Sequence, residues 1–395
     1  MKLAAASAAY GQVAPLRALS GKQTKRSQRT VVIMFDGFGL DYLEQSDMPA
    51  LRRWQRHGLY QQVTGVMPSV TNANNASICC GVFPRQHGIT GNSYLDLSTG
   101  HEEYMEAANL LLAPTLFEHA ARQGVSSALL SSKKKTISLL SRGAAIAVTP
   151  EEPSADWVDL LGPAPSIYSR EINYWLVRAA IYILRHRPEI GCLYVHTTDY
   201  PMHTWAPDAP ESKEHLKTID ALLGEACEAA PDAAFLLTAD HGMNHKDRCY
   251  DLDKTLANLG LPIRISISAE RDKYVLHHRG LGGTAWIYLN RPEDRKKVFE
   301  ALRKLVGVES VLTREEAVAK FNLYGSRIGD LCVFGDQKTV FGTLEQASGE
   351  LPSTYRSHGS IHELNIPLFV CNATGAPPGS YFQHNLDLTR WLYRG

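Results

Sequence analysis

Runs of apolar, β-branched residues alternate along this chain with segments whose apolar residues recur at helical spacing. The run VVIMF at residues 31–35 contains no polar position, as expected of a strand buried on both faces of a sheet. Further strand candidates are SSALLS at 126–131, GCLYVHTT at 191–198, AAFLLTAD at 233–240 and IPLFVCN at 366–372. The helical segments are residues 48–59, 115–124, 172–188 and 211–230. This alternation predicts an α/β fold with a mostly parallel central sheet and helices on both of its faces.

The pattern of long apolar strands alternating with helices changes between about residue 250 and residue 345. Basic segments such as RISISAERDKYVLHHRG and several short strand candidates predict a smaller α+β insertion there. We therefore divide the chain into a core, residues 29–249 and 346–395, and an insertion, residues 250–345. Residues 1–28 contain alanines but no compact apolar block, so we interpret them as a poorly anchored leader rather than a secretory signal.

Charge and cysteine content exclude several function classes. Lys and Arg together number 41, as do Asp and Glu, so no net field attracts nucleic acid or an anionic membrane. The longest apolar runs, such as GAAIAV, are far too short to span a bilayer. The seven cysteines include no CxxC pair, which favours reduced thiols and a cytoplasmic protein.

Carboxylates and imidazoles stand just beyond the strand candidates. They are Asp36, Asp199, Asp240, His241 and His358, together with His203, which lies four residues after Asp199. Ligand sites in open parallel sheets form outside the carboxyl ends of the strands, so these side chains are expected to meet at one edge. Each one alone has an ordinary interpretation as turn chemistry. The joint pattern favours a common site.

Three carboxylates and three imidazoles cannot crowd together without a counter-charge, because like charges repel and desolvation is costly. One or two divalent cations would neutralise them. Mixed nitrogen and oxygen ligands suit zinc, with manganese or iron as substitutes. Six other histidines lack this placement and are interpreted as surface or core residues: His87, His101, His215, His277, His278 and His384.

The stretch VMPSVTNANNASICCG at residues 66–81 sets a hydroxyl where an apolar run gives way to a helix. Metal coordination lowers the pKa of a hydroxyl and makes it a competent nucleophile, so Thr71 is a candidate for that role. A helix N-terminus offers N–H groups to a phosphoryl oxygen. At least one of Asn72, Asn74 and Asn75 is expected to orient the phosphorus centre or to cap the helix. Taken alone, Thr71 would be an N-cap.

Together these motifs resemble the alkaline phosphatase superfamily, in its phosphodiesterase-like branch. The matching pieces are FDGFG, PSVTNANNASI, PRQHGITGN, TTDYPMH, ADHGM and SHG, and they span residues 31 to 372. Within the superfamily, VTNANN and TTDYPMH are most similar to the phosphonoacetate hydrolases. The nucleotide pyrophosphatase/phosphodiesterases share the metal ligands but are less similar around the nucleophile.

The resemblance implies an alkaline phosphatase-like core with a cap insertion and a set of roles for its residues. One zinc would be held by Asp199, His203 and His358, and the other by Asp36, Asp240 and His241. Thr71 would be a further ligand of the second zinc and the nucleophile. Asn92 would hold the phosphoryl oxygens together with a zinc and a backbone N–H. Members of this group are often homodimers.

Lysines near the substrate carboxylate are a further implied feature, and SSKKKTISLL offers Lys133, Lys134 and Lys135. If the segment leaves its strand extended, alternate residues share a face, which favours Lys133 and Lys135. The alternative is a solvated basic turn.

Three functions are compatible with these motifs. The first is hydrolysis of the C–P bond of a small phosphonate, phosphonoacetate, to acetate and phosphate through a phosphothreonine. The second is a phosphodiesterase or nucleotide pyrophosphatase with the same two-metal site, in which Phe38, Tyr94 or Tyr200 could stack on a base. The third is a binding protein without activity, which the complete ligand set opposes. None of these functions requires a nucleic acid or membrane partner.

Overall fold

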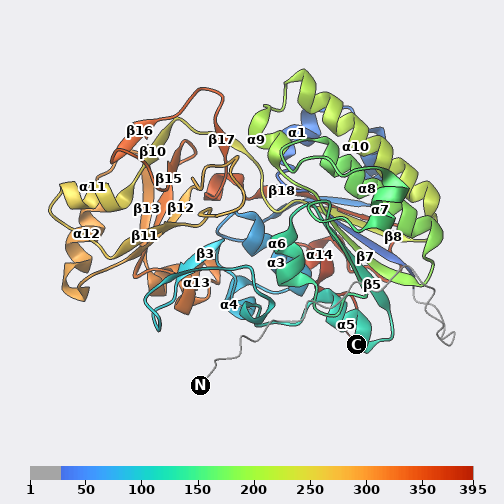
Figure 1. The fold of residues 1–395 in the computed structure, drawn as a ribbon, viewed down its shortest axis with the longest axis horizontal. Coiled ribbons are helices and arrows are strands. Elements are labelled where there is room, and N and C mark those ends of the chain that lie inside the picture. The colour runs from blue at the N-terminus through green and yellow to red at the C-terminus, as the bar shows by residue number, and fades with distance from the viewer. Residues whose placement is uncertain (1–27, 395) are drawn as a thin grey trace.

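A seven-stranded sheet forms the centre of the computed structural model, which describes residues 28–394 (Figure 1). The strand order is β2-β18-β8-β1-β7-β5-β6. The bounds are β1 (Thr30–Met34), β2 (Leu59–Thr64), β5 (Ser126–Ser131), β6 (Ile146–Val148), β7 (Ile190–His196), β8 (Ala234–Thr238) and β18 (Asn365–Cys371). All pairings are parallel except those of β18, which runs antiparallel to β8 and β2. The predicted α/β fold with a mostly parallel sheet is confirmed.

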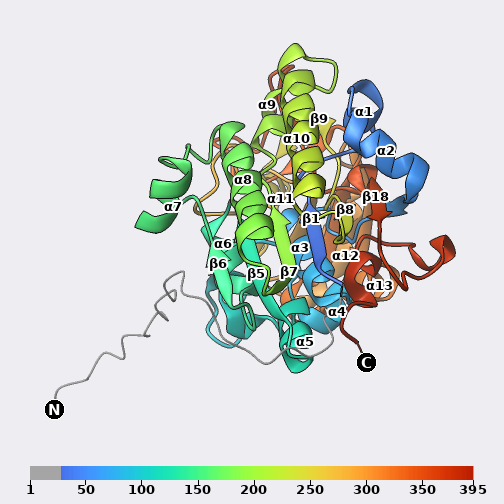
Figure 2. The same cartoon turned by 90° about the vertical axis from the view of Figure 1, so that its right-hand side faces the viewer.

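Helices cover both faces of this sheet, which explains why its central strands β1 and β8 are almost entirely apolar. All five residues of β1 are buried. On one face lie α8 (Glu171–His186) and α10 (Pro210–Ala229), which run beside each other across the sheet (Figure 2). On the other lie α3 (Thr71–Cys80), α5 (Leu116–Arg122) and α14 (Asp387–Arg390) (Figure 1). The main apolar core fills the space between these layers.

Local sequence signals explain where several helices begin and end. Thr115 and Glu118 form a capping box at the start of α5, in which each side chain accepts from the other residue's backbone N–H. In α8 an acidic residue opens the first turn and basic residues close the last, which suits the helix dipole. Most residues of α8 are buried, because the helix packs on the sheet and also against α7 and α10.

A second lobe is built mainly from residues 250–345 and appears in yellow and orange in Figure 1. Its four-stranded antiparallel sheet has the order β11 (Ile265–Ser268), β12 (Thr284–Tyr288), β14 (Leu331–Gly335), β13 (Val308–Thr313). Its helices are α11 (Leu252–Asn258), α12 (Arg295–Leu302) and α13 (Arg314–Phe321). Two separate apolar clusters lie on the two sides of this sheet.

A small sheet joins the two ends of this lobe, because β10 (Arg248–Tyr250) pairs with both β15 (Thr339–Phe341) and β16 (Ser348–Glu350). The division into a core and a cap insertion stays a prediction as far as its bounds are concerned. The predicted leader at residues 1–28 lies, except for Gln28, outside the described residues.

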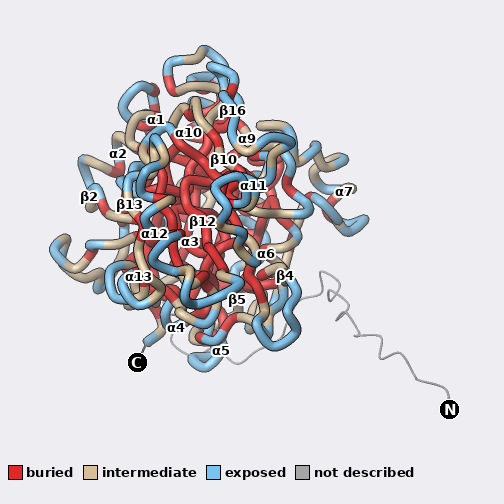
Figure 3. Tube along the Cα trace, turned by 90° about the vertical axis from the view of Figure 1, so that its left-hand side faces the viewer, coloured by how far each residue is buried: buried red, intermediate tan, exposed pale blue. Residues whose placement is uncertain are grey.

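The remaining elements are short. The helices are α1 (Leu40–Gln45), α2 (Pro49–His57), α4 (Pro84–His87), α6 (Lys134–Leu140), α7 (Ala155–Leu161) and α9 (Tyr200–Thr204). The strands are β3 (Ser93–Leu95), β4 (Glu102–Tyr104), β9 (Asn244–His245) and β17 (Arg356–Ser357). Buried segments concentrate in the interior of both lobes, and the outer loops and helix surfaces are exposed (Figure 3). Within residues 28–394, none of the helices combines the length and the apolar character needed to cross a bilayer.

Candidate active site and metal centre

Three neighbouring strands end at one edge of the central sheet and deliver three carboxylates to one place. In the parallel register, Met34 of β1 stands beside His196 of β7 and Thr238 of β8. Asp36 and Asp240 follow their strands by two residues, and Asp199 follows β7 by three. Because the strand ends are aligned, the three side chains converge at the carboxyl edge of the sheet.

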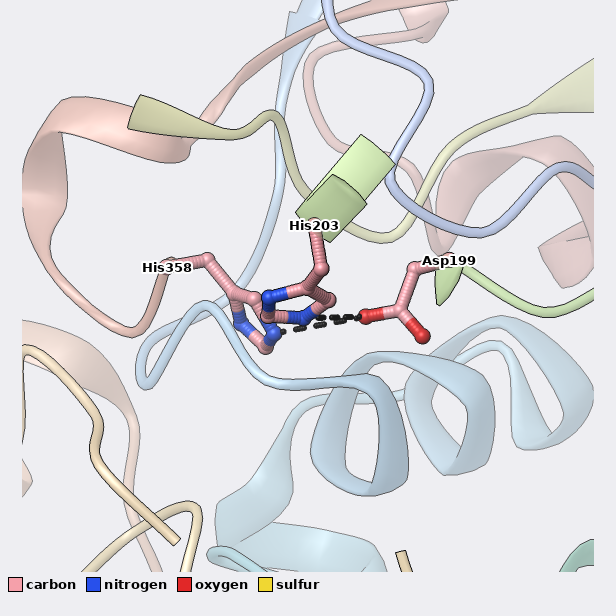
Figure 4. Close-up of side chains that lie close together, drawn as sticks. All are labelled: Asp199, His203 and His358. Carbon is pink, nitrogen blue, oxygen red and sulfur yellow. Dashed lines mark hydrogen bonds and ion pairs between the residues drawn. The ribbon is translucent and has the colours of Figure 1, made fainter. Parts of the chain in front are cut away.

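The first cluster consists of Asp199, His203 and His358 (Figure 4). The single turn of α9 carries His203 back over Asp199, with 2.9 Å between His203 Nε2 and Asp199 Oδ2. His358 Nε2 lies 3.5 Å from the same oxygen. Nδ1 of His203 donates to the Arg356 carbonyl at 2.7 Å, and Nδ1 of His358 to the Ser69 carbonyl at 2.8 Å. These outer bonds fix the tautomers, so both Nε2 lone pairs face the cluster.

The second cluster consists of Asp36, Asp240 and His241. Nε2 of His241 lies 3.2 Å from Asp240 Oδ2 and 3.8 Å from Asp36 Oδ1. Nδ1 of His241 donates to the Gly242 carbonyl at 2.9 Å, which again leaves Nε2 toward the carboxylates. The Thr71 hydroxyl oxygen joins this group, 3.2 Å from Asp36 Oδ1 and 3.4 Å from His241 Nε2.

The two clusters adjoin. The rings of His241 and His358 stack with their centroids 3.5 Å apart. Lys133 contacts both groups, because its Nζ lies 2.8 Å from Asp36 Oδ2 and 3.2 Å from Asp199 Oδ1. All six cluster residues are buried, so their charges interact in a medium that screens less than water does.

The pKa values reflect this crowding. Burial and the Asp199 carboxylate disfavour charge on Asp36, but Lys133 and His196 outweigh them and hold its pKa well below the usual range. Burial, and then the charge on Asp36, raises the pKa of Asp240. Burial opposes protonation of His241, yet Asp240 and Asp36 together raise its pKa to about 10. The second cluster therefore strongly attracts a positive charge.

The donor set fits a dinuclear metal site. Among residues 28–394, Asp240 Oδ2 and His358 Nε2 are buried polar atoms without a hydrogen-bond partner, and each belongs to one cluster. Buried polar atoms are rarely left unpaired, so an unpaired ligand atom in each cluster fits a site that binds a cation. Each cluster offers three ligand atoms within 4.8 Å of one another. The second cluster offers two carboxylates and one imidazole, and the first offers one carboxylate and two imidazoles. Both donor sets bind divalent transition metals.

Thr71 is the first residue of α3, and Val70 occupies the N-cap position. None of the three nearby asparagines caps this helix. Asn72 donates to the carbonyls of Gly91 and Met105, and Asn74 to those of Val66, Pro68 and Val70.

Asn75 bonds to Tyr194 and to His196 Nδ1. Their amides therefore brace the backbone and side chains around the nucleophile position, because an irregular buried loop has many carbonyls to satisfy. The prediction that one of the three caps α3 was wrong, and the alternative that one of them orients the phosphorus centre stays a prediction.

The lysine run does not continue its strand. The predicted extended conformation ends at Lys133, which occupies the N-cap position of α6, and Lys134 begins the helix. Lys135 Nζ contacts Asn92 Oδ1 at 3.2 Å and forms an ion pair with Asp272. Lys134 turns outward and pairs with Glu152 at 2.5 Å. Lys133 and Lys135 thus face the site together, although by a strand-to-helix turn rather than by strand alternation.

Several ionisable residues at the site were not predicted from the sequence. His196 is the last residue of β7, and its Nε2 lies 3.2 Å from Asp36 Oδ2. The strand-end rule could have found it. His277 and His278, interpreted above as surface or core residues, lie at 3.3 Å from Asp199 Oδ1 and 3.6 Å from Glu270 Oε2 respectively.

Glu270, His277 and His278 come from the loop between β11 and β12. Burial raises the pKa of Glu270 to about 8, and burial lowers that of His277. Glu270 follows the end of β11 by two residues, as Asp36 follows β1, so the strand-end rule could have found it. His277 and His278 lie farther along the loop and reach the site through the packing of the second lobe on the core.

Comparison with known proteins gives a family match. Residues 30–361 match the family model for type I phosphodiesterase / nucleotide pyrophosphatase. Bis(5'-adenosyl)-triphosphatase ENPP4 of Bos taurus is 26% identical over 240 residues, which covers 58% of this chain and 51% of that protein. Human ectonucleotide pyrophosphatase/phosphodiesterase family member 5 is 22% identical over 93% of this chain and 76% of its own length. The chain spans about half the length of the ENPP4 relatives that it matches.

Solved structures show the same likeness. Phosphonoacetate hydrolase from Sinorhizobium meliloti 1021, solved in complex with phosphonoacetate, is 30% identical with a TM-score of 0.83, covering 93% of this chain and 95% of that one. Murine ectonucleotide pyrophosphatase / phosphodiesterase 5 in complex with AMP is 17% identical with a TM-score of 0.67, covering 92% and 93%. The second of these shares the fold.

Proposed function

The chain belongs to the type I phosphodiesterase / nucleotide pyrophosphatase family of the alkaline phosphatase superfamily, and on that premise we propose that it is a phosphonoacetate hydrolase. The reaction is hydrolysis of the C–P bond of phosphonoacetate to acetate and phosphate. The observation that carries the proposal is the pair of lysines at the dinuclear site. Lys133 and Lys135 bring two ammonium groups to a buried centre that also holds Thr71 and Asn92.

Thr71 is the proposed nucleophile. Its hydroxyl donates a hydrogen bond to Asp36 Oδ1, which holds the oxygen at the second cluster. When bound, the metals lower the pKa of this hydroxyl and offset negative charge on the phosphoryl oxygens. Thr71 Oγ1 forms a bond to phosphorus as the C–P bond breaks, which gives a phosphothreonine. Water then cleaves that ester and releases phosphate.

The lysines address the difficult part of this reaction, the departure of a carbanion. The electron pair of the C–P bond passes to carbon and delocalises into the adjacent carboxylate as an enediolate, which takes up a proton to become acetate. An ammonium has three hydrogens to donate. Two protein acceptors are assigned to each of Lys133 and Lys135, which leaves one hydrogen for the substrate carboxylate. Cations that meet a charge growing in the transition state raise the rate.

Asn92 is the proposed holder of a phosphoryl oxygen, through its side-chain N–H. The proposed metals are two zinc ions per chain, with manganese or iron as substitutes, since each cluster mixes imidazole and carboxylate ligands. The proposed compartment is the cytoplasm. All seven cysteines are free thiols, which suits a reducing environment.

A phosphodiesterase or nucleotide pyrophosphatase is the second candidate, supported by the curated relatives. A nucleotide enzyme would need aromatic side chains that stack on the base, and two of the three predicted residues do not stand at the site. Phe38 is buried in a stack with Phe35, and Tyr94 lines a separate pocket with Leu97. Only Tyr200, of the three predicted residues, stands beside the site, where its ring meets His277 at 5.7 Å.

The test compares two substrates on the zinc-loaded protein. Phosphate release from phosphonoacetate is measured beside nitrophenol release from a bis-nitrophenyl phosphodiester. We expect the higher kcat/KM for phosphonoacetate. A preference for the phosphodiester, with no phosphate released from phosphonoacetate, would replace this proposal with the second candidate.

A further inference from the structure

The second lobe reaches the proposed phosphoryl site through Glu270. The backbone N–H of Asn92 donates to the carbonyl of Ala269 at 2.9 Å, which docks the loop after β11 on the core loop that carries Asn92. Glu270 follows at once, and only 2% of its surface is exposed. A carboxyl group this deeply buried needs polar partners.

The Asn92 amide is held from both ends. Its Nδ2 donates to Glu270 Oε2 at 3.1 Å, and its Oδ1 accepts from Lys135 Nζ at 3.2 Å. The chemistry of the partners fixes the orientation of the amide. An ammonium can only donate, so the oxygen must face Lys135, and the nitrogen must then face Glu270. Rotating the amide by half a turn would break both bonds at once.

We propose that Glu270 is a positioning residue for Asn92. By accepting one Nδ2 hydrogen it fixes the amide plane, and so fixes the direction in which the second Nδ2 hydrogen is offered to a phosphoryl oxygen. This inference rests on the proposed function, in which Asn92 holds such an oxygen. It also assigns a role to the second lobe, since a hydrogen-bond donor of the core is aligned by a side chain from the cap.

Glu270 does not belong to either ligand cluster. Its Oε1 lies 3.4 Å from His358 Nδ1, but that nitrogen donates to the Ser69 carbonyl and its ring meets the cluster through Nε2. The route from Glu270 to the reaction therefore runs through Asn92. Mutation of an outer partner that orients a functional side chain typically lowers affinity or activity by about tenfold to a hundredfold.

A double-mutant cycle separates this role from a structural one. In the zinc-loaded enzyme, Glu270→Ala should lower kcat about tenfold to a hundredfold, and KM should change by a smaller factor than kcat does. Glu270→Gln keeps the length and an acceptor oxygen, so it should stay within about threefold of the parent. In an Asn92→Ala background, Glu270→Ala should cause no further loss. The matched control is Glu300→Ala, an exposed glutamate on α12 of the same lobe.

The affinity for inorganic phosphate, measured by calorimetry, is a readout that does not depend on turnover. This affinity should fall in Glu270→Ala, recover in Glu270→Gln, and show the same lack of additivity with Asn92→Ala. Metal content should match the parent in every variant.

Equal losses from Glu270→Ala with and without Asn92 would overturn the inference, as would a Glu270→Gln variant as impaired as the alanine. Kinetics are measured on both phosphonoacetate and the nitrophenyl phosphodiester. A parent that ignores phosphonoacetate would refute the proposed substrate, while the cycle on the phosphodiester and on phosphate would still decide the role of Glu270.

Discussion

At the scale of single residues, the hydroxyl of Thr71 lies between two ionisable side chains of the second cluster. It contacts Asp36 and His241, whose pKa values are shifted in opposite directions, and α3 holds its backbone in place. All ten residues of α3 are buried, so other parts of the protein pack around this position. A side chain in such a place is poised for chemistry rather than for surface solubility.

Replacing Thr71 tests the covalent mechanism. Thr71→Ala should abolish turnover while metal content and melting temperature stay close to the parent, because only the nucleophile is lost. Thr71→Ser keeps a hydroxyl and should retain some activity. The measurement is kcat for both substrates, with metal analysis on the same samples. Near-normal turnover in Thr71→Ala would exclude the phosphothreonine route.

The lysine run contains its own control. Lys135→Ala should cut phosphonoacetate hydrolysis by about thirtyfold to several-hundredfold, since one charged contact in a water-poor site contributes about 2–4 kcal/mol to the transition state. Lys134→Ala should change little, because Lys134 turns outward to Glu152. Activity on the phosphodiester should stay near the parent in Lys134→Ala and should fall by a smaller factor than phosphonoacetate hydrolysis in Lys135→Ala, because Lys135 also holds the Asn92 amide oxygen. Equal losses of Lys135→Ala on the two substrates would make the lysine structural.

Lys133→Ala should lower phosphonoacetate hydrolysis at least as strongly as Lys135→Ala. Lys133 also touches Asp36 and Asp199, so part of its effect should appear on the phosphodiester as well. The ratio of the two losses, measured as kcat/KM, separates its role toward the substrate from its role toward the ligands. A Lys133→Ala enzyme with parental kinetics on both substrates would contradict both roles.

At the scale of elements, the pairing of α8 with α10 encloses an ionisable ring. His215 of α10 is buried, its Nδ1 lies 3.0 Å from the Tyr174 hydroxyl of α8, and burial lowers its pKa to about 3. The neutral ring is compatible with the helix interface, but a protonated ring is not. An unfolded histidine takes up its proton near pH 6.5, so acid favours the unfolded chain.

The pH dependence of stability follows with a definite sign. Because the folded pKa of His215 lies below the unfolded value, its contribution is lost as the pH falls from about 6.5 toward 3, by about 1.4 kcal/mol per pH unit. A His215→Phe variant cannot take up this proton, so its free energy of unfolding should fall less steeply with acid by about that amount. Urea titrations at pH 6, 5 and 4 with chelator present measure both slopes. Identical slopes would mean that His215 is already protonated in the folded protein.

At the scale of the whole molecule, two lobes build one site. The core supplies both ligand clusters and the nucleophile position, and the loop between β11 and β12 supplies Glu270, Asp272 and His277. The site is therefore complete only when the lobes are packed together. The homodimer implied by the family resemblance stays a prediction.

Metal binding should couple to the stability of this assembly. We expect two divalent ions per chain, zinc when supplied, because the three buried carboxylates among the six ligands repel one another without cations. Removal by chelator should abolish activity and lower the melting temperature; a ligand at a hundred times its Kd stabilises the folded state by about 2.7 kcal/mol. Elemental analysis and thermal melting are the measurements. Full activity in metal-free protein would refute the dinuclear site.

The strand-end positions of Asp36, Asp199 and Asp240 could be read from the sequence, because each follows an apolar run long enough to identify as a buried strand. A parallel sheet aligns the carboxyl ends of its strands, so the order of elements already implies that these side chains converge. The turn of helix between Asp199 and His203 is equally local. For such residues, local patterning and the rules of the α/β fold suffice.

Only the tertiary structure decided how the site is surrounded. Whether Lys135 faces the site depended on a turn from strand to helix that the run of lysines does not encode. Asn75 forms hydrogen bonds with His196 and Tyr194 in the interior. Glu270 and His277 reach the centre because one lobe packs on the other. Contacts of this kind are set by the summed packing of many residues distant in sequence, and no short stretch of the chain carries that information.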